Sequence, residues 1–258
     1  MDWLLTDDRG PVRWLTLNRP EKKNALPHDG WPDLRRAIGE FEASKQRVLV
    51  LTGAGGEFCA GADLDSMAVE DSSVVDRHRR MKLVGSVALA LHRLPKPTIA
   101  AVDGVAVGAG MNLALGCDLV IATERARFSE IFVRRGLGLD TGGSWLLPRI
   151  VGLQRAKEIS LTGRIVESAE ALAIGLVLEI VAPDSLEARV TEVAQDLLRG
   201  APLAQGFAKQ MLNASFRSGF GDALSWEGQA QAVLMGSEDL EEGIAAFRER
   251  RDPEWKGR

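Results

Sequence analysis

One carboxylate stands in a stretch of the sequence that is otherwise rich in glycine and apolar residues. The stretch is VRRGLGLDTGGSWLLP, residues 133–148, and the carboxylate is Asp140. We expect Leu137, Leu139 and Trp145 to shield it from water, and desolvation raises the pKa of a carboxyl group. A carboxyl group with a raised pKa is suited to general-base chemistry near neutral pH. The alternative is an Asx turn, in which the side chain bonds only to nearby backbone.

Glycine-rich segments at 51–64 and 103–119 could bring main-chain N–H groups close to a ligand. They do not match a dinucleotide fingerprint, because Phe58 and Leu113 stand where its third glycine belongs, and no GKS or GKT marks a P-loop. In VGAGMNLAL the glycines precede a short helical pattern, whose first N–H groups are free. One of these, paired with an N–H from CAGADL, would form an oxyanion hole, each donor contributing about 2.7–4 kcal/mol. Tight turns without a ligand are the alternative.

Length and composition limit the size of the fold and the kinds of ligand or partner that we expect. The 258 residues suffice for one large domain or for one domain with a helical appendage. A net charge of −4 argues against nucleic acid or an anionic membrane as the main partner. Three histidines and two cysteines without a CxxC motif leave little for a metal site. The N-terminal residues carry no signal-peptide pattern and no apolar run approaches ~20 residues, so we expect a cytoplasmic protein.

The order of apolar runs and helical patterns predicts an α/β fold. Apolar runs at 12–18, 47–53, 98–104 and 117–123 read as strands buried on both faces, and the segments 31–44 and 74–94 have helical spacing. Such runs separated by helices indicate a largely parallel sheet covered by helices. Beyond Gly152 the pattern is mostly helical, with one further strand predicted at 176–181.

Several motifs together resemble a known family. They are NRPEKKNAL (18–26), LTGAGGEFCAGADL (51–64), AAVDGVAVGAGMNLALGCDLVIAT (100–123), GLDTGGSWLLPRIVG (138–152) and EGIAAFRERRDPEW (242–255). In this order they resemble the crotonase superfamily, the enoyl-CoA hydratase/isomerase group, over essentially the whole chain. The resemblance implies a crotonase-like spiral of β-β-α units over residues 1–200. It also implies a C-terminal helical region, 201–258, that builds homotrimers or hexamers.

The resemblance also implies a ligand and residues that bind it. The ligand is an acyl-CoA thioester, with CoA as part of the substrate, no separate cofactor and no metal. The backbone N–H groups of Ala62 and Ala109 match the two that polarise the thioester carbonyl. The positions of the two glutamates that hold water in the hydratases carry Asn112 and Phe132. The segments that line the CoA moiety match Lys23, Asn24, Ala25, Leu26, Ala60, Asp63 and Leu64.

Asp140 matches the position of the catalytic aspartate in isomerases that act on enoyl-CoA or on ring-epoxide phenylacetyl-CoA substrates. Phenylalanine cannot transfer a proton and asparagine has no useful basicity, so hydration by the two-glutamate route is not expected. The first hypothesis is therefore an isomerase of lipid metabolism that moves a double bond or opens a ring epoxide, with Asp140 as acid and base. Two alternatives stay open: an enoyl-CoA hydratase with atypical acids, and a non-catalytic CoA-ester binder or scaffold.

Other residues are expected to be structural. We expect Glu130 at the surface, Asp118 in a structural role at a strand start and His92 in an ordinary surface or core position. Trp145 is a candidate for the acyl pocket, with plain core packing as the alternative. The acyl group is left open, because the pocket length depends on residues 68–80 and on the C-terminal helices.

Overall fold

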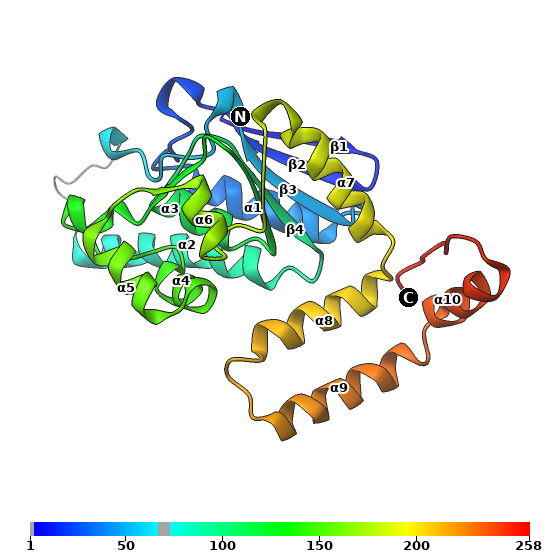
Figure 1. Ribbon diagram of the computed structural model, residues 1–258. Coiled ribbons are helices and arrows are strands. Elements are labelled where there is room, and N and C mark those ends of the chain that lie inside the picture. The colour runs from blue at the N-terminus through cyan, green and yellow to red at the C-terminus, as the bar shows by residue number, and fades with distance from the viewer. Residues whose placement is uncertain (1–2, 67–72) are drawn as a thin grey trace.

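The computed structural model describes residues 3–66 and 73–258, so part of the 68–80 segment lies outside the described residues (Figure 1). Its main sheet has the strand order β1-β2-β3-β4-β6-β9. The strands are β1 Leu4–Arg9, β2 Val12–Leu17, β3 Val48–Gly53, β4 Thr98–Val102, β6 Leu119–Thr123 and β9 Glu179–Val181. Only β1 runs antiparallel to its neighbour, and the other adjacent pairs are parallel. The predicted α/β fold with a largely parallel sheet is confirmed.

The last strand is shorter than predicted. Residues 176–178 belong to the turn before β9, although Leu176 and Val177 are buried. Their N–H groups bond to the Ala171 carbonyl at the end of the preceding helix, at 2.8 and 3.4 Å. Leu176 and Val177 are therefore apolar because the turn buries them, and pairing with β6 begins at Glu179.

A second, smaller sheet has the order β5-β7-β8. Its strands are β5 Val105–Val107, β7 Arg127–Ser129 and β8 Val166–Glu167. β5 and β7 pair in parallel, with Val107 opposite Ser129. This pairing brings the start of the helix after β5 close to the residues that follow β7, where the candidate acids lie.

Helices cover both faces of the main sheet. One face packs against α7 (Leu186–Leu198), which runs across the strands in Figure 1. The other face meets the larger core with the remaining helices of the body: α1 Trp31–Ala43, α2 Val74–Arg93, α3 Ala109–Leu115, α4 Gly143–Val151, α5 Leu153–Thr162 and α6 Ser168–Ala173. Short 3-10 helices join these elements: η1 Pro20–Lys22, η2 Ala54–Gly56, η3 Leu64–Ser66, η4 Ile131–Arg135 and η5 Pro183–Ser185.

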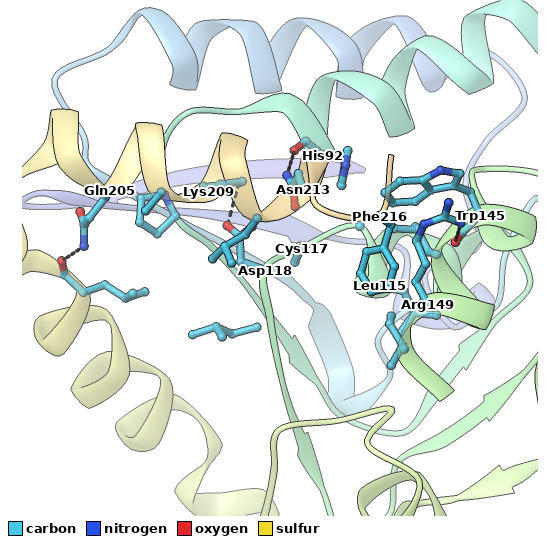
Figure 2. Close-up of a pocket in the computed structure, with 18 residues that line it drawn as sticks. His92, Leu115, Cys117, Asp118, Trp145, Arg149, Gln205, Lys209, Asn213 and Phe216 are labelled. Carbon is cyan, nitrogen blue, oxygen red and sulfur yellow. Dashed lines mark hydrogen bonds and ion pairs between the residues drawn. The ribbon is translucent and has the colours of Figure 1, made fainter. Parts of the chain in front are cut away.

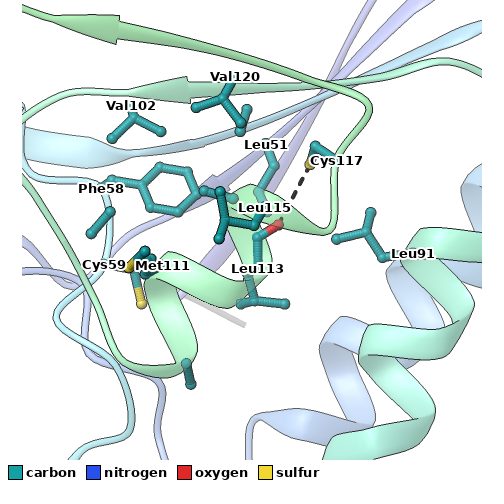
Figure 3. Packing of buried hydrophobic residues seen from close by; sticks show 14 of the residues in the cluster. Leu51, Phe58, Cys59, Leu91, Val102, Met111, Leu113, Leu115, Cys117 and Val120 are labelled. Atoms are coloured by element: carbon teal, nitrogen blue, oxygen red, sulfur yellow. Dashed lines mark hydrogen bonds between the residues drawn. The ribbon is translucent and has the colours of Figure 1, made fainter. Parts of the chain in front are cut away.

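The larger core fixes α3 in place. Met111 is fully buried among Phe58, Cys59 and neighbouring aliphatic residues, so it is a core residue (Figure 3). Both cysteines, Cys59 and Cys117, are buried and free. Burial raises the pKa of each thiol to about 12. Every residue of this seven-residue helix is buried, so its position is set by packing on all sides.

Three C-terminal helices extend from this body (Figure 1). They are α8 Pro202–Ala214, α9 Phe220–Leu234 and α10 Glu238–Glu249, and we call them the C-terminal arm. Large apolar side chains are exposed along the arm, including Leu212, Phe216, Phe220, Met235 and Phe247. An ion pair of 2.7 Å between Lys209 of α8 and Asp118 ties the arm to the body. Asp118 also accepts bonds from Thr98, in keeping with the structural role expected for it.

Candidate functional site

The loop that carries Ala62 is bound to strand β5 by main-chain hydrogen bonds. The N–H of Cys59 donates to the Val105 carbonyl at 2.8 Å, and the N–H of Val107 donates to the Cys59 carbonyl at 2.9 Å. This bridge sets the loop beside the connection from β5 to α3, where Ala109 begins the helix. The structure thus brings the two predicted N–H donors, Ala62 and Ala109, into neighbouring segments.

Glycine is required where these two segments meet. Gly61 has a φ of +92°, and a Cβ there would lie 2.8 Å from the Val107 carbonyl oxygen and 3.7 Å from the Ala109 nitrogen. A Cβ on Gly110 would lie 2.3 Å from the Cys59 carbonyl oxygen. Such distances exclude a side chain, so the close approach of the two backbones depends on these glycines.

The N–H groups of Ala62 and Ala109 are available to a ligand. Ala109 is the first residue of α3, a position whose N–H has no acceptor within the helix. Across the described ranges, 3–66 and 73–258, no main-chain hydrogen bond satisfies either N–H. Two free donors in adjacent segments are what an oxyanion hole requires.

Asp140 lies in the turn that leads into α4. Its Oδ1 accepts a 2.8 Å hydrogen bond from the Thr141 hydroxyl, and the N–H of Gly143 donates to its carbonyl at 2.9 Å. Burial raises the pKa of Asp140, and the bond from Thr141 offsets part of this shift. The hydroxyl takes the place of the backbone N–H expected in an Asx turn. Leu137 is 43% exposed, so it contributes little of the shielding that the sequence suggested.

Thr141 holds a strained backbone conformation beside this carboxylate. Its φ is +50°, and its side chain is buried. A β-branched residue avoids this left-handed region, which costs of the order of 1–3 kcal/mol. The surrounding structure therefore fixes the residue next to Asp140 in one conformation.

Asn112 connects the helix α3 to the Asp140 turn. Its buried amide nitrogen donates to the Asp140 carbonyl at 3.0 Å and to Glu130 Oε2 at 3.3 Å. A Cβ on Gly143 would lie 2.4 Å from this nitrogen, so the start of α4 rests directly on the amide. Asn112, which the resemblance matches to one of the two glutamates, therefore links Glu130 to the Asp140 turn.

Glu130 is fully buried, so the prediction that it lies at the surface was wrong. Burial raises its pKa to about 8, with a smaller contribution in the same direction from the charge of Asp140. The chain leaves β7 at Ser129 and turns into η4, which keeps three consecutive residues, Phe128 to Glu130, inside. The sequence held one signal: alternation along β7 places Glu130 on the face of the fully buried Phe128.

Phe132 places an apolar ring beside the connection from β5 to α3. A Cβ on Gly108 would lie 3.5 Å from the tip of this ring, and Gly108 directly precedes Ala109. The side chain is only 6% exposed. Phe132, which the resemblance matches to the second glutamate, therefore presents a packed hydrocarbon surface with no proton to exchange.

The predicted CoA-lining segment divides into structural and exposed residues. Asn24 is 1% exposed, and its amide nitrogen donates to the carbonyls of Ala54 and Glu57 at 2.8 and 2.5 Å. Ala25 and Leu26 are buried in the body. The N–H groups of these three residues also bond within the protein, to the carbonyls of Arg19, Lys22 and Gly61. The three residues therefore support the loops of this region structurally.

Charged side chains near this segment pair with one another. Asp63 is 6% exposed and accepts bonds from Arg19 at 2.9 Å and from Lys22 at 3.1 Å. Lys23 pairs with Glu57 at 3.1 Å while more than half of its side chain stays exposed. Two further residues were predicted to line the CoA moiety, Ala60 (half-buried) and Leu64 (exposed). Lys23 and Leu64 thus remain accessible to a large ligand.

Two cavities lie between the body and α8. One of about 520 Å³ is lined by His92, Trp145, Arg149 and Phe216, among others (Figure 2). The other, of about 650 Å³, shares His92 and Trp145 and includes Gly142 of the Asp140 turn. The ring centroids of His92 and Trp145 are 5.1 Å apart, edge to face, and the Arg149 guanidinium lies 4.0 Å from the Trp145 ring. Trp145 therefore lines both cavities, and His92 lies beside it; a role for Trp145 in an acyl pocket stays a prediction.

Comparison with known proteins decides the family. The family model described as enoyl-CoA hydratase/isomerase matches residues 8–258. The chain belongs to the enoyl-CoA hydratase/isomerase family. An enoyl-CoA hydratase from Bacillus anthracis has the same fold, with a TM-score of 0.93 and 32% identity over 99% of this chain and 100% of that one. The predicted crotonase resemblance and fold are confirmed.

Relatives within the enoyl-CoA hydratase/isomerase family carry more than one reaction in their names. The 1,2-epoxyphenylacetyl-CoA isomerase of Escherichia coli (strain K12) is 34% identical over 100% of both chains. The short-chain-enoyl-CoA hydratase of Clostridium acetobutylicum is 35% identical over 96% of this chain and 95% of its own length. These near-equal identities establish an enzyme of the family and leave the reaction to the chemistry of the site.

Proposed function

We propose that this enzyme isomerises an acyl-CoA thioester, moving a double bond or opening a ring epoxide, with Asp140 as acid and base. The observation that carries the proposal is the set of side chains at the candidate acid positions. Asp140 is a shielded carboxylate with a raised pKa, whereas Asn112 and Phe132 occupy the two glutamate positions. One base opposite an oxyanion hole is enough to take a proton from one carbon and return it to another.

For double-bond migration, the thioester oxygen accepts hydrogen bonds from the N–H groups of Ala62 and Ala109. Asp140 removes a proton from a carbon of the acyl chain, and the electron pair moves through the conjugated carbons to the thioester oxygen, which becomes an enolate. The same carboxyl group then returns the proton at a different carbon. No net charge or atom is gained, and CoA remains part of the substrate. The ring of Phe132 keeps an apolar surface where a hydratase would hold water.

The raised pKa of Asp140 suits both halves of this cycle. A base weaker than an ordinary carboxylate would not take the proton, and a much stronger one would not return it. Two oxyanion donors at about 2.7–4 kcal/mol each stabilise the enolate between the two transfers. We further propose that the reaction needs no metal and no cofactor beyond the CoA moiety.

The decisive experiment follows 3-enoyl-CoA and 2-enoyl-CoA with the pure enzyme in deuterated water by mass spectrometry. Double-bond migration, with or without incorporated deuterium, and no addition of water is the expected result. Asp140→Asn should lower kcat by a factor of about 10²–10⁴ while CoA-ester binding persists, because only the proton transfer is lost. Asp184→Asn, at an exposed carboxylate in η5, serves as the matched control. An active Asp140→Asn enzyme would overturn the assignment.

Hydration is the second candidate, and the buried Glu130 beside Asn112 is the observation that favours it. A carboxyl group near one of the two glutamate positions could activate water in place of the missing acid. Product heavier by one water molecule in the same assay, lost in Glu130→Gln and retained in Asp140→Asn, would establish this reaction. Binding of both esters without turnover would instead support a scaffold and would prompt the same assay with ring-epoxide substrates.

A further inference from the structure

Glu130 is a buried acid that the proposed proton transfer does not use. Its side chain is fully buried, and its Oε1 has no hydrogen-bond partner among the described residues. Its Oε2 accepts one bond, from the amide nitrogen of Asn112 at 3.3 Å. A charged carboxylate held this way would lack most of the hydrogen bonds that it has in water, which carries a large free-energy cost.

The amide of Asn112 joins Glu130 to the Asp140 turn. Its nitrogen has two hydrogens, so it can donate to Glu130 Oε2 and to the Asp140 carbonyl together. The start of α4 at Gly143 rests on the same nitrogen, so the amide has little room to move. A change at Glu130 therefore reaches the backbone of Asp140 through one side chain.

Asp140 is the neighbouring charge that acts on Glu130. Helix α3, which supplies Asn112, carries no charged residue. The charged side chains of β7, η4 and α5 are exposed at the surface: Arg127, Arg134, Arg135, Arg155, Lys157 and Glu158. On α4, Arg149 is half-buried and donates to the Trp145 carbonyl with its guanidinium against the Trp145 ring. Burial and the charge of Asp140 together raise the pKa of Glu130 to about 8, against a smaller opposing effect of the bond from Asn112, so Glu130 is mostly protonated at neutral pH.

We infer that Glu130 is a positioning residue for Asp140, acting through the shared amide of Asn112 as the neutral member of a carboxyl pair. This inference rests on the proposed isomerisation. A neutral Glu130 leaves the Asn112 amide on the Asp140 carbonyl and adds no second negative charge near the enolate. An ionised Glu130 would bind the same amide more strongly, because charge-assisted hydrogen bonds are the stronger ones. Since the start of α4 rests on that amide, the stronger bond would act on the backbone of the Asp140 turn.

The test measures kcat and KM between pH 5.5 and 9.5 for three forms of the enzyme. Wild-type kcat should fall as the pH rises through about 8, the pKa of Glu130. Glu130→Gln keeps the neutral shape, so its kcat at pH 6.5 should stay within about threefold of wild type. It should also lack the alkaline fall, with KM unchanged. Glu42→Gln, at an exposed site on α1, should follow wild type at every pH.

Two kinetic outcomes would overturn the inference. An alkaline fall that persists unchanged in Glu130→Gln would show that another group controls it. A loss of about 100-fold or more at pH 6.5 would show that Glu130 itself transfers a proton, because glutamine preserves the position and removes only the acid.

Infrared spectroscopy in deuterated buffer supplies a readout that does not depend on turnover. The carbonyl stretching band of a protonated carboxylic acid should persist in the wild-type enzyme at pH 7 and fade through about pH 8. The band should be missing from Glu130→Gln and present in Glu42→Gln. No such band at pH 7 would refute the neutral state of Glu130. If the protein isomerises no ester but shows the band, the proposed isomerisation is wrong and the neutral state of Glu130 is still supported.

Discussion

At the scale of single residues, the two buried acids of the candidate site, Asp140 and Glu130, have very few hydrogen-bond partners. Asp140 has a hydroxyl from Thr141, and Glu130 has one amide hydrogen from Asn112. Because neither acid forms an ion pair with a cation in the part of the chain that the structure describes, burial raises the pKa of both. The effect should be visible in stability as well as in catalysis.

The raised pKa of Glu130 predicts a dependence of stability on pH. The folded protein keeps this proton up to about pH 8, whereas an unfolded glutamate releases it near its ordinary value of 4.5. Between these values the unfolded state binds fewer protons, so the free energy of unfolding falls as pH rises, by up to about 1.4 kcal/mol per pH unit. Denaturant unfolding of wild type and Glu130→Gln at pH 5, 6.5, 8 and 9.5 checks this.

In that comparison Glu130→Gln should lose stability less steeply than wild type between pH 5 and 8. The two curves should run parallel above pH 8, where the folded and unfolded forms of the wild type are both ionised at Glu130. Glu42→Gln controls for removal of a carboxylate as such. Parallel curves across the whole range would mean that Glu130 titrates alike in the folded and unfolded states.

At the scale of elements, more of the fold than of the candidate site could be predicted from the sequence. Runs such as 47–53 and 117–123 predicted buried strands correctly, because a strand buried on both faces must be apolar throughout. Glu130 was predicted at the surface because the alternation along β7 is only a weak signal for the burial of a single acid, which also depends on the turn into η4 after β7. Likewise, the buried bonds of Asn24 to two distant carbonyls arise only when its loop meets η2.

The contact between α4 and Asn112 predicts a sensitive position at Gly143. A Cβ there would lie 2.4 Å from the Asn112 amide nitrogen, so Gly143→Ala must displace either the amide or the start of α4. We expect a destabilisation of about 1–3 kcal/mol, typical of overpacking, together with a clear drop in kcat. Gly85→Ala in α2, where a Cβ meets nothing within 4 Å, is the control and should be neutral or stabilising.

Thermal unfolding and kcat measured together separate the two effects at Gly143. A variant that is destabilised but fully active would show that the amide moves without disturbing Asp140. That result would weaken the link between Asn112 and the Asp140 turn.

At the scale of the whole molecule, the C-terminal arm carries apolar surface that the body does not cover. Phe247 is 85% exposed and Phe220 82% exposed, both on helices that extend from the body (Figure 1). Exposed apolar surface in a contiguous patch is typical of protein interfaces. The helical region predicted to start at 201 contains α8, which begins at Pro202. We therefore predict that the arm mediates assembly into trimers or hexamers.

Sedimentation velocity of wild type and Phe247→Asp tests this assembly. Wild type should sediment as a trimer or hexamer, and the charged variant should shift toward smaller species, because a carboxylate in an apolar interface is costly to bury. Lys157→Asp, at an exposed site on α5 in the body, serves as the control. A monomeric wild type over the micromolar range would contradict the prediction.

The buried cysteines offer a way to measure how often the region around α3 opens. Cys59 precedes the loop that presents Ala62 and lies against Gly110 of α3, and Cys117 follows that helix. Cys59 is fully buried and the pKa of its thiol is raised to about 12, so a thiol reagent can modify it only when this region opens, whereas Cys117 lines the cavity of about 520 Å³ beside α8. The labelling rate of Cys59, with and without a bound CoA ester, would therefore report how often the two candidate N–H donors separate in solution.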